Sequence, residues 1–135
     1  IDIEFLKEII YIPEITPTTN SDILGLITLR QDVISVLDLN TQLGFETDIK
    51  SKTRAIIIWY ENKSVALLVD DVKMVEDVDK NLIEKMPENF KDSNVEAVYK
   101  GDKIVSILST SFIANLIRKY HIKEENDDIK KDEIK

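Results

Sequence analysis

Short runs of β-branched and other apolar residues, separated by polar turns, constrain the fold of this chain more than any other feature. Three pairs of such runs occur, in residues 25–39, 54–69 and 95–109. Val, Ile and Thr fit the pleated surface of a sheet, and a short polar segment between two runs favours a tight chain reversal. The sequence therefore predicts a mainly β protein with three β-hairpins.

The turns of these hairpins are predicted at residues 30–32, 61–63 and 100–103. The third is the strongest turn signal, because Gly101 and its polar neighbours are typical turn residues. At the start of the chain, apolar residues alternate in Ile1–Phe5 and then change to near-helical spacing. This pattern predicts a strand that bends into a turn.

One helix is expected near the C-terminus, over residues 111–120. After Ser111 an apolar stripe follows at helical spacing: Phe112, Ile113, Leu116, Ile117 and Tyr120. A stripe of this width predicts a helix that packs on the protein's own β structure. Residues 123–135 are rich in charge and carry no periodic apolar face, which predicts a flexible tail.

Charge and residue types exclude several functions. The chain has 18 Lys and Arg against 26 Asp and Glu, a net charge of −8. A chain this acidic repels a phosphate backbone, so nucleic-acid binding is not expected. The longest apolar runs, 55–60 and 65–69, are far shorter than the roughly 20 residues that span a bilayer. Direct membrane insertion is not expected either.

Catalytic and cofactor motifs are also missing from the sequence. Cysteine is absent, the one histidine is His121, and the three glycines lie far apart, so no catalytic, metal or cofactor site is expected. The acidic pairs at 70–71 and 77–79 lack calcium-loop spacing and are read as solvated loops. A small-ligand-binding or enzymatic β-barrel that uses Asp70, Asp71, Glu76 and Asp77 stays open as an alternative.

Parts of the sequence resemble one another. Apolar residues at three-residue intervals occur twice, as Ile3, Leu6 and Ile9 and as Val69, Val72 and Val75. Residues 34–37 likewise resemble residues 105–108. Such repetition predicts two similar small β units. A strand at 55–60 precedes the repeated segment in the second unit, so the matching first strand of the first unit is expected upstream of Ile1.

Six segments together resemble the CheW family of bacterial chemotaxis coupling proteins over about residues 1–118. They are IDIEFLKEII, IPEITP, LGLITLRQDVISVLDLNTQLGF, TRAIIIW, VALLVDDVKMV and AVYKGDKIVSILS. The third is the most specific, because it resembles the family's Leu-Arg-Gly, Ile-Pro-Val, Asp-Leu and Leu-Gly pattern. The matching residues are Leu29-Arg30, Val33-Ile34, Val36, Asp38-Leu39 and Leu43-Gly44.

Two residues depart from the family pattern. Gln31 stands where the family usually has Gly, and Ser35 stands where it usually has Pro. Glycine reaches a positive φ without steric cost. Without it, the turn is expected either to take another shape or to use Asp32 as its left-handed residue.

The resemblance implies a CheW-like domain over residues 1–122. This domain would consist of two intertwined, five-stranded SH3-like β-barrels side by side, at about residues 1–45 and 53–109, and the helix at 111–120. The first strand of the first barrel would be missing from this sequence.

The resemblance further implies a non-enzymatic adaptor in chemotaxis signal transduction. Such an adaptor couples transmembrane chemoreceptors to the histidine kinase CheA. The implied partners are the cytoplasmic tip of a methyl-accepting chemotaxis receptor, the regulatory domain of CheA and further CheW copies. The implied location is the cytoplasm, at receptor arrays on the inner membrane. CheW-like domains also occur in CheA and in CheV, and a domain of either protein stays open as an alternative. The roughly fifteen residues after Tyr120 favour CheW over CheV, because the receiver domain of CheV is not expected in so short a segment.

Three residues occupy family positions that would face a partner: Leu6, Glu8 and Arg30. By the resemblance, Glu8 and Arg30 would pair across the first barrel and orient the receptor-facing surface. Leu6 would lie beside the receptor groove. The alternatives are a core position for Leu6 and simple solvation of the two charged residues.

Overall fold

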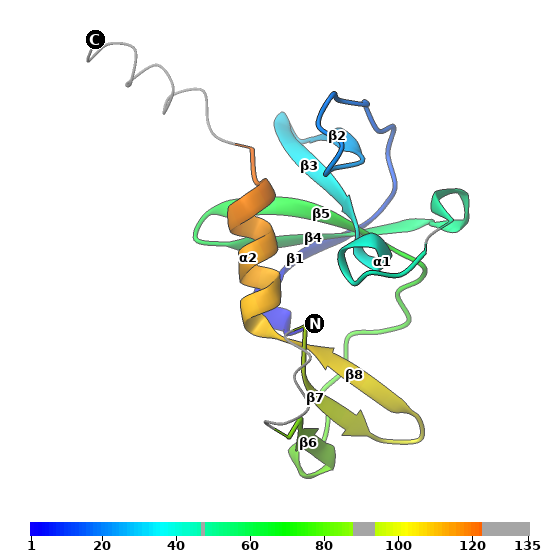
Figure 1. The fold of residues 1–135 in the computed structure, drawn as a ribbon, viewed down its shortest axis with the longest axis vertical. Helices are drawn as coiled ribbons and strands as arrows, with labels where there is room; N and C mark the ends of the chain where they lie inside the picture. Colours follow the sequence, from blue (N-terminus) through cyan, green and yellow to red (C-terminus); the bar gives the residue numbers. More distant parts are fainter. Residues whose placement is uncertain (47, 88–93, 123–135) are drawn as a thin grey trace, which may run out of the picture.

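The structure is a computed structural model that describes residues 1–46, 48–87 and 94–122 (Figure 1). Its elements are η1 Ile3–Phe5, β1 Leu6–Tyr11, β2 Gly25–Leu29, β3 Asp32–Asp38, α1 Leu39–Gln42, η2 Ile49–Ser51, β4 Arg54–Tyr60, β5 Lys63–Val69, η3 Lys80–Leu82, β6 Ile83–Lys85, β7 Val95–Lys100, β8 Ile104–Leu108 and α2 Thr110–Tyr120. The predicted tail at 123–135 lies outside the described residues. None of the described helices has the length and apolar character needed to cross a bilayer.

The strands form two sheets, which confirms the predicted mainly β fold with a short C-terminal helix. One sheet has the order β1-β4-β5-β3-β2, and the other has the order β6-β7-β8. The described sheets thus contain five and three strands, not five each. The hairpin at 54–69, assigned above to the second unit, lies in the first sheet. Every residue from Val65 to Val69 is apolar and buried, and such a strand is stable only inside a sheet that is covered on both faces.

The three predicted hairpins are present as β2–β3, β4–β5 and β7–β8. The first two have two-residue turns, because Leu29 pairs with Asp32 and Tyr60 pairs with Lys63. These turns are one residue shorter than predicted. A two-residue turn matches the right-handed twist of the strands that it joins.

The predicted strand at Ile1–Phe5 is wrong. Residues Ile3–Phe5 form a short 3₁₀ helix, and the strand begins at Leu6. Asp2 caps this helix, because its carboxylate accepts a hydrogen bond from the Glu4 N–H at 2.9 Å. A local side-chain bond of this kind competes with extended structure. Ile3 is 63% exposed, and Phe5 is the buried residue of this segment.

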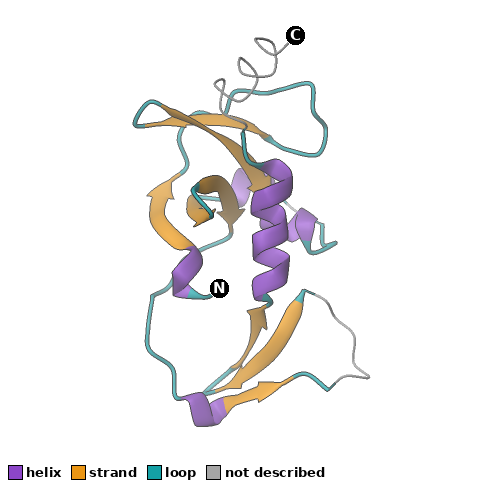
Figure 2. Cartoon of the chain, turned by 90° about the vertical axis from the view of Figure 1, so that its left-hand side faces the viewer, coloured by secondary structure: helices purple, strands orange, loops and turns teal. Residues whose placement is uncertain are grey.

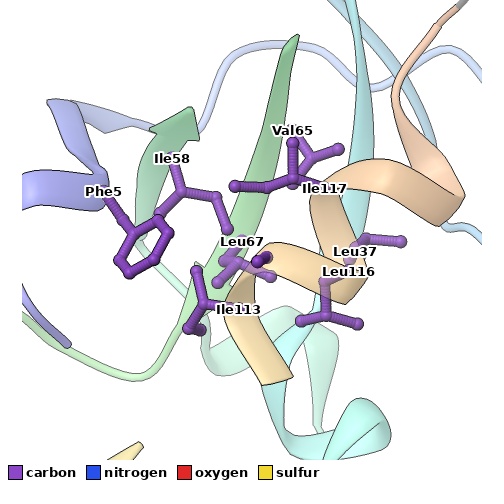
Figure 3. Packing of buried hydrophobic residues seen from close by; sticks show 9 residues of the cluster. Phe5, Leu37, Ile58, Val65, Leu67, Ile113, Leu116 and Ile117 are labelled. Carbon is purple, nitrogen blue, oxygen red and sulfur yellow. The ribbon is translucent and has the colours of Figure 1, made fainter. Parts of the chain in front are cut away.

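Two apolar clusters cover opposite faces of the five-stranded sheet. One lies under α2 and contains Phe5, Leu37, Ile58, Val65, Leu67, Ile113, Ala114, Leu116 and Ile117 (Figure 3). The other contains Ile27, Ile34, Val36, Ala55, Ile57, Ala66 and Leu68. Successive residues of β5 enter opposite clusters, as the alternation of side chains along a strand requires. The core of the molecule therefore belongs to the first sheet and α2.

Helix α2 packs on the protein's own sheet, as predicted. It begins one residue earlier than expected, because Ser109 and not Ser111 caps it: the Ser109 hydroxyl accepts a hydrogen bond from the Phe112 N–H at 3.0 Å. At the other end, the Arg118 guanidinium donates to a Glu61 carboxylate oxygen at 3.1 Å. The helix is thus fixed to the β4–β5 turn as well as to the core.

The five-stranded sheet curls so that its two edge strands approach each other. Thr16, in the segment that follows β1, exchanges two backbone hydrogen bonds of 2.8 Å with Leu26 of β2. Gly25 permits this approach, because a Cβ at that position would lie 2.3 Å from the Thr16 carbonyl oxygen. The edges are joined at this bridge and not by a continuous ladder. The first sheet is therefore barrel-like, and its second cluster lies inside the curl.

The predicted repeat holds only in part. Residues 34–37 and 105–108 both lie in strands, β3 and β8. The other match is wrong: Leu6 and Ile9 lie in β1, whereas Val72 and Val75 lie in the irregular segment after β5. Equal apolar spacing does not give equal structure here, because β1 has a partner strand in β4 and residues 70–79 have none.

Candidate partner-binding site

Glu8 and Arg30 form the predicted ion pair. The Arg30 guanidinium donates two hydrogen bonds of 2.6 Å, one to each carboxylate oxygen of Glu8. Paired donors of this kind fit a carboxylate and fix its orientation. Glu8 belongs to β1 and Arg30 follows β2, and these strands are the two edges of the first sheet. The pair therefore joins the edges of the curled sheet.

The turn after β2 places Arg30 through an uncommon backbone conformation. Arg30 and Gln31 have φ values of 49° and 75°. Of the two alternatives expected for this turn, the one in which Asp32 supplies the left-handed residue is wrong, because Asp32 is the first residue of β3. A two-residue hairpin turn with this twist needs positive φ at both central residues, whatever their identity. The ion pair to Glu8 helps to hold this conformation.

A β-bulge positions Glu8. The register between β1 and β4 shifts between Leu6 and Glu8, which leaves Lys7 as the extra residue. A bulge bends its strand and redirects the neighbouring side chains. The Glu8 side chain is 25% exposed and that of Arg30 is 69% exposed. Hydrogen bonds from Arg30 lower the pKa of Glu8, and Glu8 in turn raises the pKa of Arg30. Both groups are therefore charged at neutral pH.

Leu6 lies at the start of β1, two residues before Glu8, and faces the α2 side of the sheet, whereas Glu8 faces the other side. Leu6 is half-buried and pairs with Ile58 of β4. Neither described cluster includes Leu6, whereas its neighbour Phe5 is a full member of the cluster under α2. This placement favours a surface position over a core position. Its role in binding a partner stays a prediction.

Sequence reasoning missed a second set of side chains on β1 and β4. The Arg54 guanidinium lies 3.9 Å from the centre of the Tyr11 ring, and the Lys7 ammonium lies 5.7 Å from the centre of the Trp59 ring. Tyr11 is 72% exposed and Trp59 is 42% exposed. Trp59 lies within the unbroken apolar run at 55–60, so the sequence pattern does not distinguish it from the buried residues beside it.

The acidic residues considered as an alternative site, Asp70, Asp71, Glu76 and Asp77, do not form one cluster. Asp70 pairs with Lys52, and the Asp71 carboxylate accepts from the Val72 N–H. No group of three or more potential metal ligands occurs within residues 1–46, 48–87 and 94–122. His121 lies at the end of α2, where its Nδ1 is 2.9 Å from the carbonyl oxygen of Arg118. The four acidic residues of the alternative site are therefore not assembled into one cluster among the described residues.

Comparisons with known proteins agree with this geometry. Residues 1–118 match the family model of the CheW-like domain. The chain is 31% identical over 106 residues to the chemotaxis protein CheW of Bacillus subtilis (strain 168), which covers 75% of this chain and 68% of that relative. The crystal structure of the scaffolding protein TtCheW from Thermoanaerobacter tengcongensis superposes with a TM-score of 0.65 at 30% identity. That match covers 80% of this chain and 78% of the other.

Proposed function

Because this chain belongs to the CheW-like domain family, we propose that it is a non-enzymatic adaptor that couples transmembrane chemoreceptors to the histidine kinase CheA. The observation that carries this proposal is the family match over residues 1–118, which spans both sheets and most of α2. An adaptor needs rigid surfaces and no reaction chemistry. The curled first sheet with its buried core supplies such a surface.

We assign the receptor-facing surface to Leu6, Glu8 and Arg30. Leu6 offers an apolar side chain, and the neighbouring ion pair offers charge in a fixed orientation. The two features lie on opposite faces of the β1 edge, so a partner contacts both only when it wraps around this edge strand. Apolar anchors beside charged groups are typical of protein interfaces, where charge sets specificity and apolar contact supplies affinity.

The second partner in this proposal is the regulatory domain of CheA, which would bind elsewhere on the surface. Further copies of CheW-like proteins would extend the assembly. The protein would act in the cytoplasm, recruited to receptor arrays at the inner membrane. The net charge of −8 disfavours an anionic lipid surface as a direct partner.

A charge-exchange cycle tests the receptor surface. The affinity of the whole chain for a receptor cytoplasmic tip is measured by titration for Arg30→Glu, Glu8→Arg and the double variant. We expect Arg30→Glu to weaken binding about tenfold, because two carboxylates then face each other at the interface. The double variant restores the pair and should recover part of the loss.

The matched control is Lys63→Glu, a charge reversal at the start of β5, where Lys63 pairs with Glu61 and not with Glu8 or Arg30. It should leave the affinity close to that of the parent. Simple additivity of the two single changes, or an equal loss in the control, would contradict the assignment of this surface.

A further inference from the structure

Three chain segments enter or leave the first sheet at the same end, and each of them carries a charged residue there. Asp38 is the last residue of β3, Asp70 directly follows β5, and Lys52 lies two residues before β4. Strands β3 and β5 are parallel and β4 is antiparallel to β5, so these three positions meet. From here the chain continues into α1, into β4 and into the segment that leads to the second sheet.

Lys52 joins the other two residues from the interior. Its side chain is 0% exposed, and its ammonium nitrogen lies 2.5 Å from a carboxylate oxygen of Asp70 and 3.7 Å from one of Asp38. A buried ammonium is stable only when it is paired. We call Asp38, Lys52 and Asp70 the Lys52 network.

The two carboxylates of the network differ in their surroundings. Asp38 is 1% exposed, and its other oxygen caps α1 by accepting from the Thr41 N–H at 3.0 Å and the Thr41 hydroxyl at 2.7 Å. Asp70 is 70% exposed. Asp38 is thus part of the buried interior of the first sheet. Asp70 contacts the buried Lys52 ammonium on one side and is exposed to solvent on the other.

The second sheet is connected to the rest of the chain at two points (Figures 1 and 2). One is Ser109, which follows β8 and caps the firmly packed helix α2. The other is the segment that begins at Asp70. Residues 73–79 are all exposed, so little beyond Asp70 itself holds that segment to the first sheet. A body attached at two points can turn about the line that joins them unless each attachment is rigid.

We propose that the Lys52 network is a positioning device that fixes where the chain leaves β5 and thereby sets the orientation of the second sheet relative to the first. Lys52 is the positioning residue and Asp70 is the part that can be released. Loss of the Asp70 contact leaves the buried Asp38–Lys52 pair in place, so the first sheet stays folded while the second sheet gains freedom. This device is a property of the isolated chain and needs no partner.

The test uses Asp70→Asn in the whole chain, with Asp71→Asn as the matched control. Both variants remove one negative charge from adjacent exposed positions, but only Asp70 contacts Lys52. The chain contains no cysteine, so Lys103→Cys and Asn115→Cys give two unique sites for spin labels, one beyond β7 and one on α2. Pulsed electron–electron double resonance then measures the distances between a label on the second sheet and a label on α2.

We expect a broader or shifted distance distribution for Asp70→Asn and an unchanged one for Asp71→Asn. Amide hydrogen exchange in β4 and β5 should match that of the parent in both variants. Identical distributions in Asp70→Asn and the parent would overturn the proposal. Accelerated exchange throughout β4 and β5 in Asp70→Asn would also overturn it, because the contact would then be part of the core and not a hinge control.

Discussion

The two sheets of this protein differ greatly in how many of their side chains are buried. In the first sheet, β5 is buried on both faces and two apolar clusters pack against it. In the three strands of the second sheet, Ala97 is the single buried residue, and Ile104 and Val105 of β8 are 74% and 52% exposed. Three strands need an apolar face or a packing partner for stability of their own. We infer from this difference that the first sheet with α2 supplies most of the stability of the chain, and that the second sheet depends on it for its own.

The comparison predicts unequal costs for equal truncations. Leu67→Ala removes a fully buried side chain from the cluster under α2 and should lower the free energy of unfolding by about 2–5 kcal/mol. Ile104→Ala, in β8, should change it by less than about 0.5 kcal/mol, because that side chain is already exposed. Denaturant titration of both variants measures the difference. Similar costs would show that the second sheet carries a core of its own.

Leu6→Ala tests whether Leu6, at the edge of the first sheet, belongs to the surface or to the core. If Leu6 belongs to the surface, as its absence from both clusters suggests, the variant should lose about 1 kcal/mol of stability or less. Receptor binding should weaken by about 1–2 kcal/mol, the range of an interface anchor. A loss of stability comparable to that of Leu67→Ala would place Leu6 in the core. Normal receptor binding in a stable variant would remove it from the partner surface.

The turns of the first sheet should respond unequally to glycine. Gln31 holds a φ of 75°, a conformation that costs a non-glycine residue about 1–2 kcal/mol. Gln31→Gly should therefore raise the free energy of unfolding by about 0.5–1 kcal/mol after the greater chain entropy of glycine is counted. Asn62→Gly, at a φ of 62° in the other two-residue turn, should gain less because Asn tolerates this region. Equal gains would show that the Gln31 turn is not specially strained.

The smallest expected effect is the pH dependence of the ion pairs around the first sheet. Hydrogen bonds from Arg30, Arg118 and Lys52 lower the pKa values of Glu8, Glu61 and Asp70. A lowered folded-state pKa stabilises the fold above the ordinary pKa of the group. This contribution is lost as the pH falls through the lowered value. Stability should therefore decline on acidification below about pH 4.5, the ordinary pKa of Glu.

The variant Glu8→Gln separates this contribution from general acid effects. It should flatten the decline in the unfolding midpoint between pH 5 and about pH 3, because one of the shifted carboxyls no longer titrates. Glu76→Gln, in the exposed segment after β5, is the matched control. An equal flattening in both variants would argue against the Glu8–Arg30 pair as its source.

Local patterns predicted the elements whose stability is local. The three hairpins and α2 were found because their apolar periods and turn residues agree with their burial. The strand at Ile1–Phe5 failed because the Asp2 cap overrides apolar alternation over so short a segment. The very short elements α1 and β6 carry too few residues for any period to be read.

The residues of the candidate site and of the Lys52 network could be predicted from the sequence only in part. Glu8 and Arg30 lie on opposite sheet edges, so their pairing followed from the family resemblance and not from spacing. The turn after β2 was expected to take another shape or to use Asp32 as its left-handed residue, yet the two-residue turn imposes a positive φ on Gln31 itself. From the sequence, Lys52 is indistinguishable from an exposed lysine in a connecting segment, because no pattern shows that three chain segments converge around it. Contacts of this kind are set by topology.

The most direct test of the coupling function is a three-component capture. A receptor cytoplasmic tip is immobilised, and the CheA regulatory domain is added with and without this chain. The proposed adaptor role predicts that the kinase domain is retained well above background only when the chain is present, and that Arg30→Glu reduces this retention. Binding to neither partner, or binding to the receptor tip without any retention of the kinase domain, would contradict the account.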